Sequence, residues 1–169
     1  RMGPMSLATL DINGDNVPER FVGAQTVLST AGEGKVMAVD GASGQVIWEQ
    51  DGLDSVLGLS LMDANGDGRP ELWAYTEHRL QVFDPEVGAT LWRSYALGSS
   101  GIRQPNFIQL DADPALEILV ASDVSAVVFD GAQYQEQWRS TDVSGGIRDS
   151  SVADLDGDGQ KELALATQR

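Results

Sequence analysis

Three stretches of the chain repeat one nine-residue acidic loop: DINGDNVPE at residues 11–19, DANGDGRPE at 63–71 and DLDGDGQKE at 154–162. Each has an oxygen-bearing side chain at loop positions 1, 3 and 5, a glycine at position 4 and a glutamate at position 9. A calcium ion takes about six to eight oxygen ligands, which alternate side chains of a coiled loop can supply. The pattern therefore predicts three cation-binding loops.

Each loop offers four side chains and the backbone carbonyl of position 7 as ligands. These are Asp11, Asn13, Asp15, Val17 and Glu19; Asp63, Asn65, Asp67, Arg69 and Glu71; and Asp154, Asp156, Asp158, Gln160 and Glu162. Position 6 is Asn16, Gly68 or Gly159, which are residue types that tolerate a left-handed backbone. An EF-hand begins alike, but its bidentate glutamate stands at position 12 between helices. The earlier glutamate, together with flanking residues that favour β-structure, predicts a calcium loop that joins two strands.

The alternative for a single copy is a metal-free turn rich in Asp and Gly, but repetition with a shared ninth residue favours metal binding. Magnesium is disfavoured because it requires strict octahedral geometry and retains several waters. Zinc is disfavoured because the chain has no cysteine and one histidine, His78. We therefore expect about three Ca²⁺ ions, one in each loop.

A degenerate copy of the loop lies between the second and the last. Residues 101–103 (GIR) align with residues 146–148 at an offset of 45, which places Asp111, Asp113 and Glu117 at loop positions 3, 5 and 9. Position 1 is then Gln109, and position 6 is Pro114, which cannot adopt a positive φ. We expect this loop to bind calcium weakly or not at all.

A second motif, Asp-x7-Trp, repeats in step with the loops at residues 40–48, 84–92 and 130–138. Each copy follows an apolar run and indicates a β-hairpin. The first unit then has expected strands at 6–10, 20–23, 35–39 and 45–49, with an extended loop at 24–34. Four strands in each repeat of about 45–50 residues are typical of a β-propeller blade.

The expected fold is all-β, a single partial β-propeller domain over residues 1–169, with four antiparallel strands in each blade. The blades fall at about 6–50, 57–95 and 105–140, followed by a half blade at about 149–168 with strands at 151–153 and 163–167. About three and a half blades do not close a ring. We expect a fragment of a larger propeller, whose remaining blades come from the parent chain or another subunit; an open stack of blades is the alternative.

The composition narrows the choice of partners. The chain has 26 acidic against 11 basic residues and a formal charge of −15, so nucleic acid and anionic membrane surfaces are poor partners. No apolar run is long enough to span a membrane. Extracellular calcium modules bind at about 10⁻⁴–10⁻³ M, which favours a secreted, surface or periplasmic protein.

The loops, D-x-[DN]-G-D-x-x-x-E followed by an apolar strand, resemble the FG-GAP/VCBS-type repeats of integrin-like β-propellers. The hairpins, such as VMAVDGASGQVIW at 36–48, look like those of quinoprotein-type propeller repeats. The resemblance covers nearly the whole chain. It implies loops that bind calcium on one face of a propeller, in a domain that serves adhesion or ligand binding.

These observations favour a non-catalytic, calcium-stabilised module for adhesion or for binding a protein or carbohydrate ligand. The alternatives are the scaffold part of a secreted polysaccharide-active enzyme, or a structural subunit of a surface assembly. We predict no catalytic residue: there is no cysteine, and His78 reads as a surface residue. Arg103 and Arg148 occupy equivalent places, where they either hold an anionic ligand or form structural ion pairs. Trp48, Trp92 and Trp138 are expected to pack between blades rather than to stack on sugars.

Overall fold

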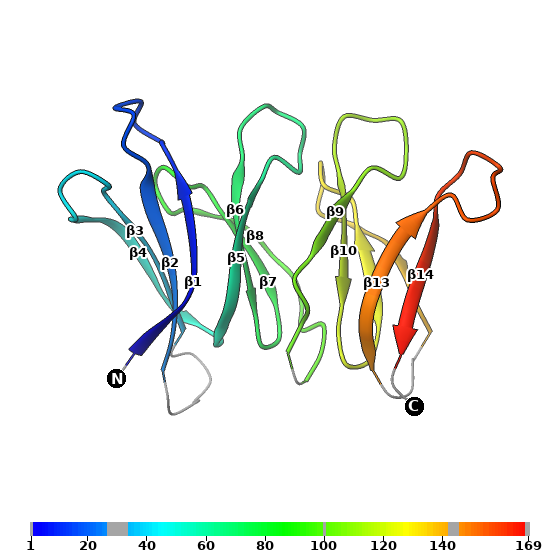
Figure 1. The fold of residues 1–169 in the computed structure, drawn as a ribbon. Coiled ribbons are helices and arrows are strands. Elements are labelled where there is room, and N and C mark those ends of the chain that lie inside the picture. The colour runs from blue at the N-terminus through cyan, green and yellow to red at the C-terminus, as the bar shows by residue number, and fades with distance from the viewer. Residues whose placement is uncertain (1, 27–33, 100, 142–145, 168–169) are drawn as a thin grey trace. The chain divides into compact units, whose positions relative to one another are not determined.

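The computed structural model describes residues 2–26, 34–99, 101–141 and 146–167. These residues form strands and turns but no helix, and none of their segments is a helix that could cross a membrane. The strands make three four-stranded antiparallel sheets and one antiparallel pair (Figure 1). The prediction of an all-β chain with repeated units of four antiparallel strands is therefore confirmed.

In every four-stranded sheet the strands pair in the order in which they follow along the chain. The first sheet holds β1 (Met2–Leu10), β2 (Glu19–Thr26), β3 (Gly34–Val39) and β4 (Val46–Leu53). The second holds β5 (Val56–Met62), β6 (Glu71–Thr76), β7 (Leu80–Phe83) and β8 (Thr90–Arg93). The third holds β9 (Asn106–Ile108), β10 (Glu117–Ala121), β11 (Ala126–Phe129) and β12 (Glu136–Arg139), and the pair is β13 (Ile147–Ala153) with β14 (Glu162–Thr167).

The first sheet is longer than the sequence indicated. β1 begins at Met2 instead of residue 6, and β2 continues to Thr26, through the start of the loop expected at 24–34. Met2 pairs with Thr26 and Gly3 with Gln25, so these backbone groups find partners across the sheet. Residues 27–33 of the expected loop lie outside the described part of the chain. β4 likewise runs on to Leu53, which pairs with Gly34. Apolar periodicity cannot show such pairing, because the pairing depends on the neighbouring strand.

The chain divides into two compact units. One holds β1–β8, and the other holds β9–β14 together with the segment Asp63–Arg69. In the first unit the two sheets share a core that contains Phe21, Val36, Leu72 and Phe83. Trp73, in β6, is fully buried.

Trp48 lies between the two sheets of the first unit. Its ring is 6.0 Å from that of Phe21 in its own sheet and 6.4 Å from that of Phe83 in the second. Its Nε1 donates a hydrogen bond of 2.9 Å to the carbonyl of Pro85. A Cβ at Gly88 would approach the indole to 2.5 Å, so the glycine gives the ring its space. The interpretation of this tryptophan as a packing residue is therefore correct. Trp138 differs, since 45% of it is exposed.

In the second unit the inner strands of the third sheet are fully buried, because their side chains are covered on both faces. Leu119, Ala121, Ala126 and Val128 from these strands pack with Ile147 of β13. Partly buried side chains of β13 and β14 complete this core, namely Val152, Leu163 and Leu165. The acidic loop between β13 and β14 is thus attached to a packed sheet.

Each Asp-x7-Trp motif forms the predicted hairpin. The Oδ1 atoms of Asp40 and Asp84 accept hydrogen bonds from backbone N–H groups two or three residues further on. Gly44 and Gly88 adopt φ values of 73° and 71° in these turns. The third hairpin has Tyr134 with a φ of 57° at the equivalent place.

Candidate metal centres

The four acidic loops occupy one place in the repeat. Each joins the first two strands of its sheet: β1 to β2, β5 to β6, β9 to β10 and β13 to β14 (Figure 1). A short strand pair therefore fixes both ends of every loop, and the ladder hydrogen bonds hold its first and last residues close together. Leu10 pairs with Glu19, Met62 with Glu71, Ile108 with Glu117, and Ala153 with Glu162.

The aspartate at position 1 organises the backbone of the three complete loops. In the second loop, Asp63 Oδ1 accepts hydrogen bonds from the N–H of Gly66 at 2.8 Å and of Asp67 at 3.1 Å. Its Oδ2 accepts one from Gly68 at 2.8 Å. Asp11 and Asp154 bind the N–H groups of positions 4 and 6 in the same way, at 2.7–3.0 Å. The chain thus coils around one carboxylate.

Positions 3 and 5 form Asx turns, in which a side-chain oxygen accepts from the backbone N–H two residues on. At position 3 the acceptors are the side chains of Asn13, Asn65 and Asp156, at 2.8–3.1 Å. At position 5 they are the side chains of Asp15, Asp67 and Asp158, at 2.7–2.8 Å. The donors for position 5 are the N–H groups of Val17, Arg69 and Gln160; coordination by the carbonyls of these residues stays a prediction.

Glycine and asparagine permit the coil. Position 6 is left-handed in each complete loop, with φ values of 66° at Asn16, 89° at Gly68 and 89° at Gly159. This confirms the backbone expected from the sequence. Position 4 is also left-handed, with φ values of 75° at Gly66 and 81° at Gly157. A side chain at these glycines would strain the backbone.

The glutamate at position 9 folds back over the start of its loop. Its Oε2 accepts the N–H of Ile12 at 2.8 Å in the first loop, of Leu110 at 2.6 Å in the third and of Leu155 at 2.7 Å in the fourth, each at position 2. Glu19, Glu71 and Glu117 are buried, whereas Glu162 is only partly so. In the first three loops the carboxylate at position 9 is therefore withdrawn from solvent.

Within the described residues, three loops bring three carboxylates within 4.8 Å of one another. The groups are Asp63, Asp67 and Glu71; Asp111, Asp113 and Glu117; and Asp154, Asp156 and Glu162. Like charges at this separation repel, and a divalent cation between them would remove the repulsion. All the donors are oxygen atoms, as hard cations such as calcium and magnesium require. These groups could hold a metal ion.

The first loop is arranged differently from the other two complete copies. The side-chain amide of Asn13 donates a hydrogen bond of 3.0 Å to Glu19 Oε1. Glu19 is fully buried, and both of its carboxylate oxygens have partners, Ile12 N and Asn13 Nδ2. The loop contains every predicted ligand, but an internal amide occupies the glutamate oxygen that would otherwise face a cation.

The third, degenerate loop keeps its shape by other means. The amide of Gln109 donates to the carbonyl of Asp111, at 3.0 Å, and to that of Asp113. Asp111 and Asp113 still form Asx turns, at 3.0 and 2.8 Å. Burial raises the pKa of Glu117; the N–H of Leu110 opposes that rise, and the charges of Asp111 and Asp113 add to it. The weak or absent calcium binding expected here stays a prediction.

Loops of the second unit also contact one another. The N–H of Leu116, at position 8 of the third loop, donates to the carbonyl of Ala64 in the second loop at 2.8 Å. The ammonium of Lys161, at position 8 of the fourth loop, donates to the carbonyl of Gln109 at 2.5 Å. A Cβ at Gly131 would lie 2.2 Å from the Leu116 carbonyl and 2.3 Å from that of Ala64. A hairpin turn thus fits closely against two loops.

Two pockets of the second unit bear on the other predicted sites. Arg103 and Arg148 line one pocket, together with Gln104, Asn106, Ala121, Asp149 and Ser150. Among the described residues, neither arginine has a carboxylate within ion-pair distance. Arg103 Nε instead donates to the carbonyl of Ile147, at 3.4 Å. The structural ion pair suggested for this position is therefore not found.

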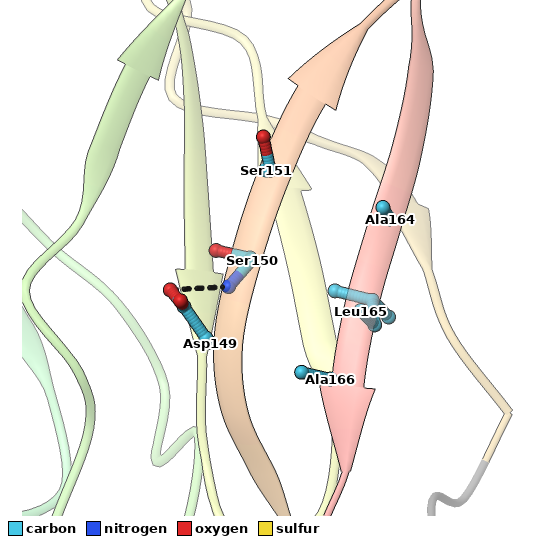
Figure 2. Close-up of a pocket in the computed structure, with 6 residues that line it drawn as sticks. All are labelled: Asp149, Ser150, Ser151, Ala164, Leu165 and Ala166. Atoms are coloured by element: carbon cyan, nitrogen blue, oxygen red, sulfur yellow. Dashed lines mark hydrogen bonds between the residues drawn. The ribbon is translucent and has the colours of Figure 1, made fainter. Parts of the chain in front are cut away.

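A second pocket lies on the paired strands β13 and β14 (Figure 2). It is lined by Asp149, Ser150 and Ser151 from β13 and by Ala164, Leu165 and Ala166 from β14. The Asp149 carboxylate accepts the backbone N–H of Ser150 at 2.9 Å. Of the six residues that line this pocket, Asp149 alone has an ionisable side chain.

No protein-family model matches the chain, and no curated protein matches it. The chain is, however, similar in fold to several solved structures. The exotype rhamnogalacturonan lyase YesX aligns at a TM-score of 0.66 and 17% identity, over 97% of this chain and 38% of its own. Rhamnogalacturonan lyase PL11 of Bacillus licheniformis aligns at 0.65 and 17%, over 96% of this chain and 39% of its own. The V. cholerae biofilm matrix protein Bap1 aligns at 0.54 and 16%, over 88% and 30%.

At these identities the similarity concerns the fold alone. The chain spans well under half the length of each of these three structures. Whatever activity the longer proteins have, the alignment covers a set of sheets within them.

Proposed function

We propose that the chain is part of a calcium-stabilised β-propeller of the FG-GAP/VCBS type, a non-catalytic module that binds a protein or carbohydrate ligand outside the cytoplasm. The acidic loops carry this proposal, since three of them group carboxylates that could share a cation. The repeated antiparallel sheets support their assignment as blades. The remaining blades would come from the parent protein or another subunit.

Calcium is the proposed ion because every donor is an oxygen and the loops supply several of them on a short coil. Magnesium would need stricter octahedral geometry, and zinc prefers nitrogen and sulfur donors. The proposed role is structural: the ion would join the ends of two strands and neutralise carboxylates that repel. Binding to the folded state alone contributes RT ln(1 + [Ca²⁺]/Kd), about 2.7 kcal/mol for each site at a hundredfold excess over Kd.

Thermal unfolding tests this role. Metal-free protein in EGTA should melt several degrees below protein in excess Ca²⁺, followed by circular dichroism, and Mg²⁺ at the same concentration should give a smaller rise. Identical melting curves in EGTA and in Ca²⁺ would contradict the structural role of calcium.

The pocket lined by Arg103 and Arg148 supports an acidic ligand. Two guanidinium groups line this pocket, and within the described residues neither is paired with a carboxylate. Guanidinium groups bind carboxylates in bidentate fashion. Acidic oligosaccharides of the rhamnogalacturonan type are the proposed ligands, since two structural neighbours act on that polymer. Calorimetric binding should weaken at least tenfold in the variant with Arg103→Gln and Arg148→Gln. Unchanged affinity would remove this pocket from the proposal.

The second candidate is the scaffold part of a polysaccharide-active enzyme. The alignment with two rhamnogalacturonan lyases over nearly the whole chain favours it. Incubation with rhamnogalacturonan, followed by ultraviolet absorbance of the unsaturated product, separates the candidates. Turnover by this chain alone would favour an enzyme, whereas binding without turnover would favour the non-catalytic module.

A further inference from the structure

We infer that the third acidic loop, residues 109–117, is itself a divalent-cation site, with Glu117 as its innermost ligand. This inference rests on the proposed calcium binding of the other loops and reverses what the sequence predicts for this one. The structure provides a buried acceptor without a partner, an unchanged number of carboxylates, and a backbone that no longer needs the missing residues.

The buried acceptor is Glu117 Oε1. Glu117 is 1% exposed, and its Oε2 accepts the N–H of Leu110 at 2.6 Å. Oε1 is buried and has no hydrogen-bond partner among the residues that the structure describes. A buried charge without a partner is costly, so this oxygen requires either a proton or a cation. One carboxylate oxygen each of Asp111, Asp113 and Glu117 lie within 4.8 Å of one another, so the glutamate belongs to a group of three acidic side chains.

The third loop has as many carboxylates as each of the first two. Loops one and two have carboxylates at positions 1, 5 and 9 and an asparagine at position 3. The third loop loses the acid at position 1, where Gln109 stands, but gains one at position 3, where Asp111 stands. Three carboxylates therefore remain to face one ion, and ligand charge is a main determinant of calcium affinity.

The two substitutions that disfavour the site in the sequence compensate for each other. In the complete loops the position 1 aspartate binds the N–H of position 6. Pro114 has no N–H to give, and Gln109 has no carboxylate to receive it. The Gln109 amide instead donates to the carbonyls of Asp111 and Asp113. The side chain at position 1 therefore still holds the coil, but as a donor to backbone carbonyls instead of an acceptor from backbone N–H groups.

The first loop provides the contrast. Its Glu19 is equally buried, but the Asn13 amide satisfies the oxygen that corresponds to the free one of Glu117. Asp111, at position 3 of the third loop, has no amide hydrogen to offer. Glu117 therefore depends on an external cation where Glu19 has an internal donor.

Calcium stoichiometry tests the inference. Metal-free wild type and the variant with Asp111→Asn and Glu117→Gln are titrated with Ca²⁺ by isothermal titration calorimetry. The variant should bind one ion fewer than the wild type. The control is Glu86→Gln, which changes an exposed glutamate in the hairpin turn and should keep the wild-type stoichiometry.

The outcomes separate the two proposals. A wild type that binds no Ca²⁺ contradicts the proposed function as well as this site. A wild type that binds Ca²⁺, with a folded variant of equal stoichiometry, overturns the third-loop site alone.

Diffraction data from wild-type crystals grown in Ca²⁺ provide the second measurement, which does not depend on the variant folding. We expect anomalous density at about 2.3–2.6 Å from Glu117 Oε1. Density in the second and fourth loops with none in the third would overturn the inference.

Discussion

At the scale of single residues, the sequence shows which residue type stands at each position of the acidic loops, but not which side-chain oxygens have hydrogen-bond partners. The repeat identifies position 9 as a glutamate in all four loops. It does not show that Glu117 has an oxygen without a partner while the oxygens of Glu19 are satisfied. That difference arises from the side chain at position 3, which is an amide in one loop and a carboxylate in the other.

The raised pKa of Glu117 predicts how pH changes the stability of the metal-free protein. A carboxyl group whose folded pKa lies above its ordinary 4.5 adds stability below the unfolded pKa, and this contribution is lost as pH rises through the folded pKa. In EGTA at pH 7, Glu117→Gln should therefore be more stable than wild type, by on the order of 1 kcal/mol. The difference should shrink towards pH 4, as measured by urea unfolding.

Excess Ca²⁺ should reverse the order of stability at pH 7, because the charged carboxylate then has a cation. Glu86→Gln should match wild type under both conditions. A Glu117→Gln variant that is less stable than wild type in EGTA at neutral pH would show that the buried carboxylate does not destabilise the metal-free protein.

At the scale of strands and hairpins, the sequence predicted the number of strands and their order better than the residues at which the strands begin and end. Apolar runs and turn residues indicated four strands in each repeat and their order along the chain. The additional length of β1 and β2 comes from pairing between Met2–Pro4 and Ala24–Thr26, which no local pattern encodes. The hairpin aspartates and glycines were predictable because their roles are local.

Trp48 and Trp138 each end an Asp-x7-Trp motif, but their different burial predicts unequal mutational effects. Trp48→Ala removes contacts with Phe21 and Phe83 and a hydrogen bond to Pro85, and should cost about 3 kcal/mol, the lower end for such truncations. Trp138→Ala should cost under about 0.5 kcal/mol, since the side chain is 45% exposed. Chemical denaturation of both variants in Ca²⁺ measures the two effects. Equal losses would mean that the tryptophans have the same structural role.

At the scale of the whole molecule, the formal charge of −15 should make the metal-free protein sensitive to salt. Raising NaCl from about 10 mM to about 1 M shortens the Debye length from about 30 Å to about 3 Å and screens repulsion between the loops. The melting temperature in EGTA should therefore rise steeply with NaCl. In excess Ca²⁺ the same series should give a shallower slope, because bound ions have already offset part of the charge. Parallel slopes would indicate that calcium does not reduce the repulsion.

The division of the chain into two compact units was not predicted from the sequence. The repeat suggests equivalent blades, and it does not show that the segment Asp63–Arg69 groups with the second unit. Two contacts help to explain this grouping: the Ala64 carbonyl accepts the N–H of Leu116 and fits closely against Gly131. Long-range backbone contacts of this kind leave no periodic signal.

Hydrogen bonds from Leu116 to the Ala64 carbonyl and from Lys161 to the Gln109 carbonyl connect three acidic loops of the second unit in a row. An ion that ordered one loop would also fix a backbone group to which the next loop is hydrogen-bonded. The next loop would then lose less conformational entropy when it binds its own ion. Occupancy would then rise over a narrower range of calcium concentration than independent sites allow, with a Hill coefficient above one. In that case the loops of this row would change from empty to occupied over a small increase in calcium concentration.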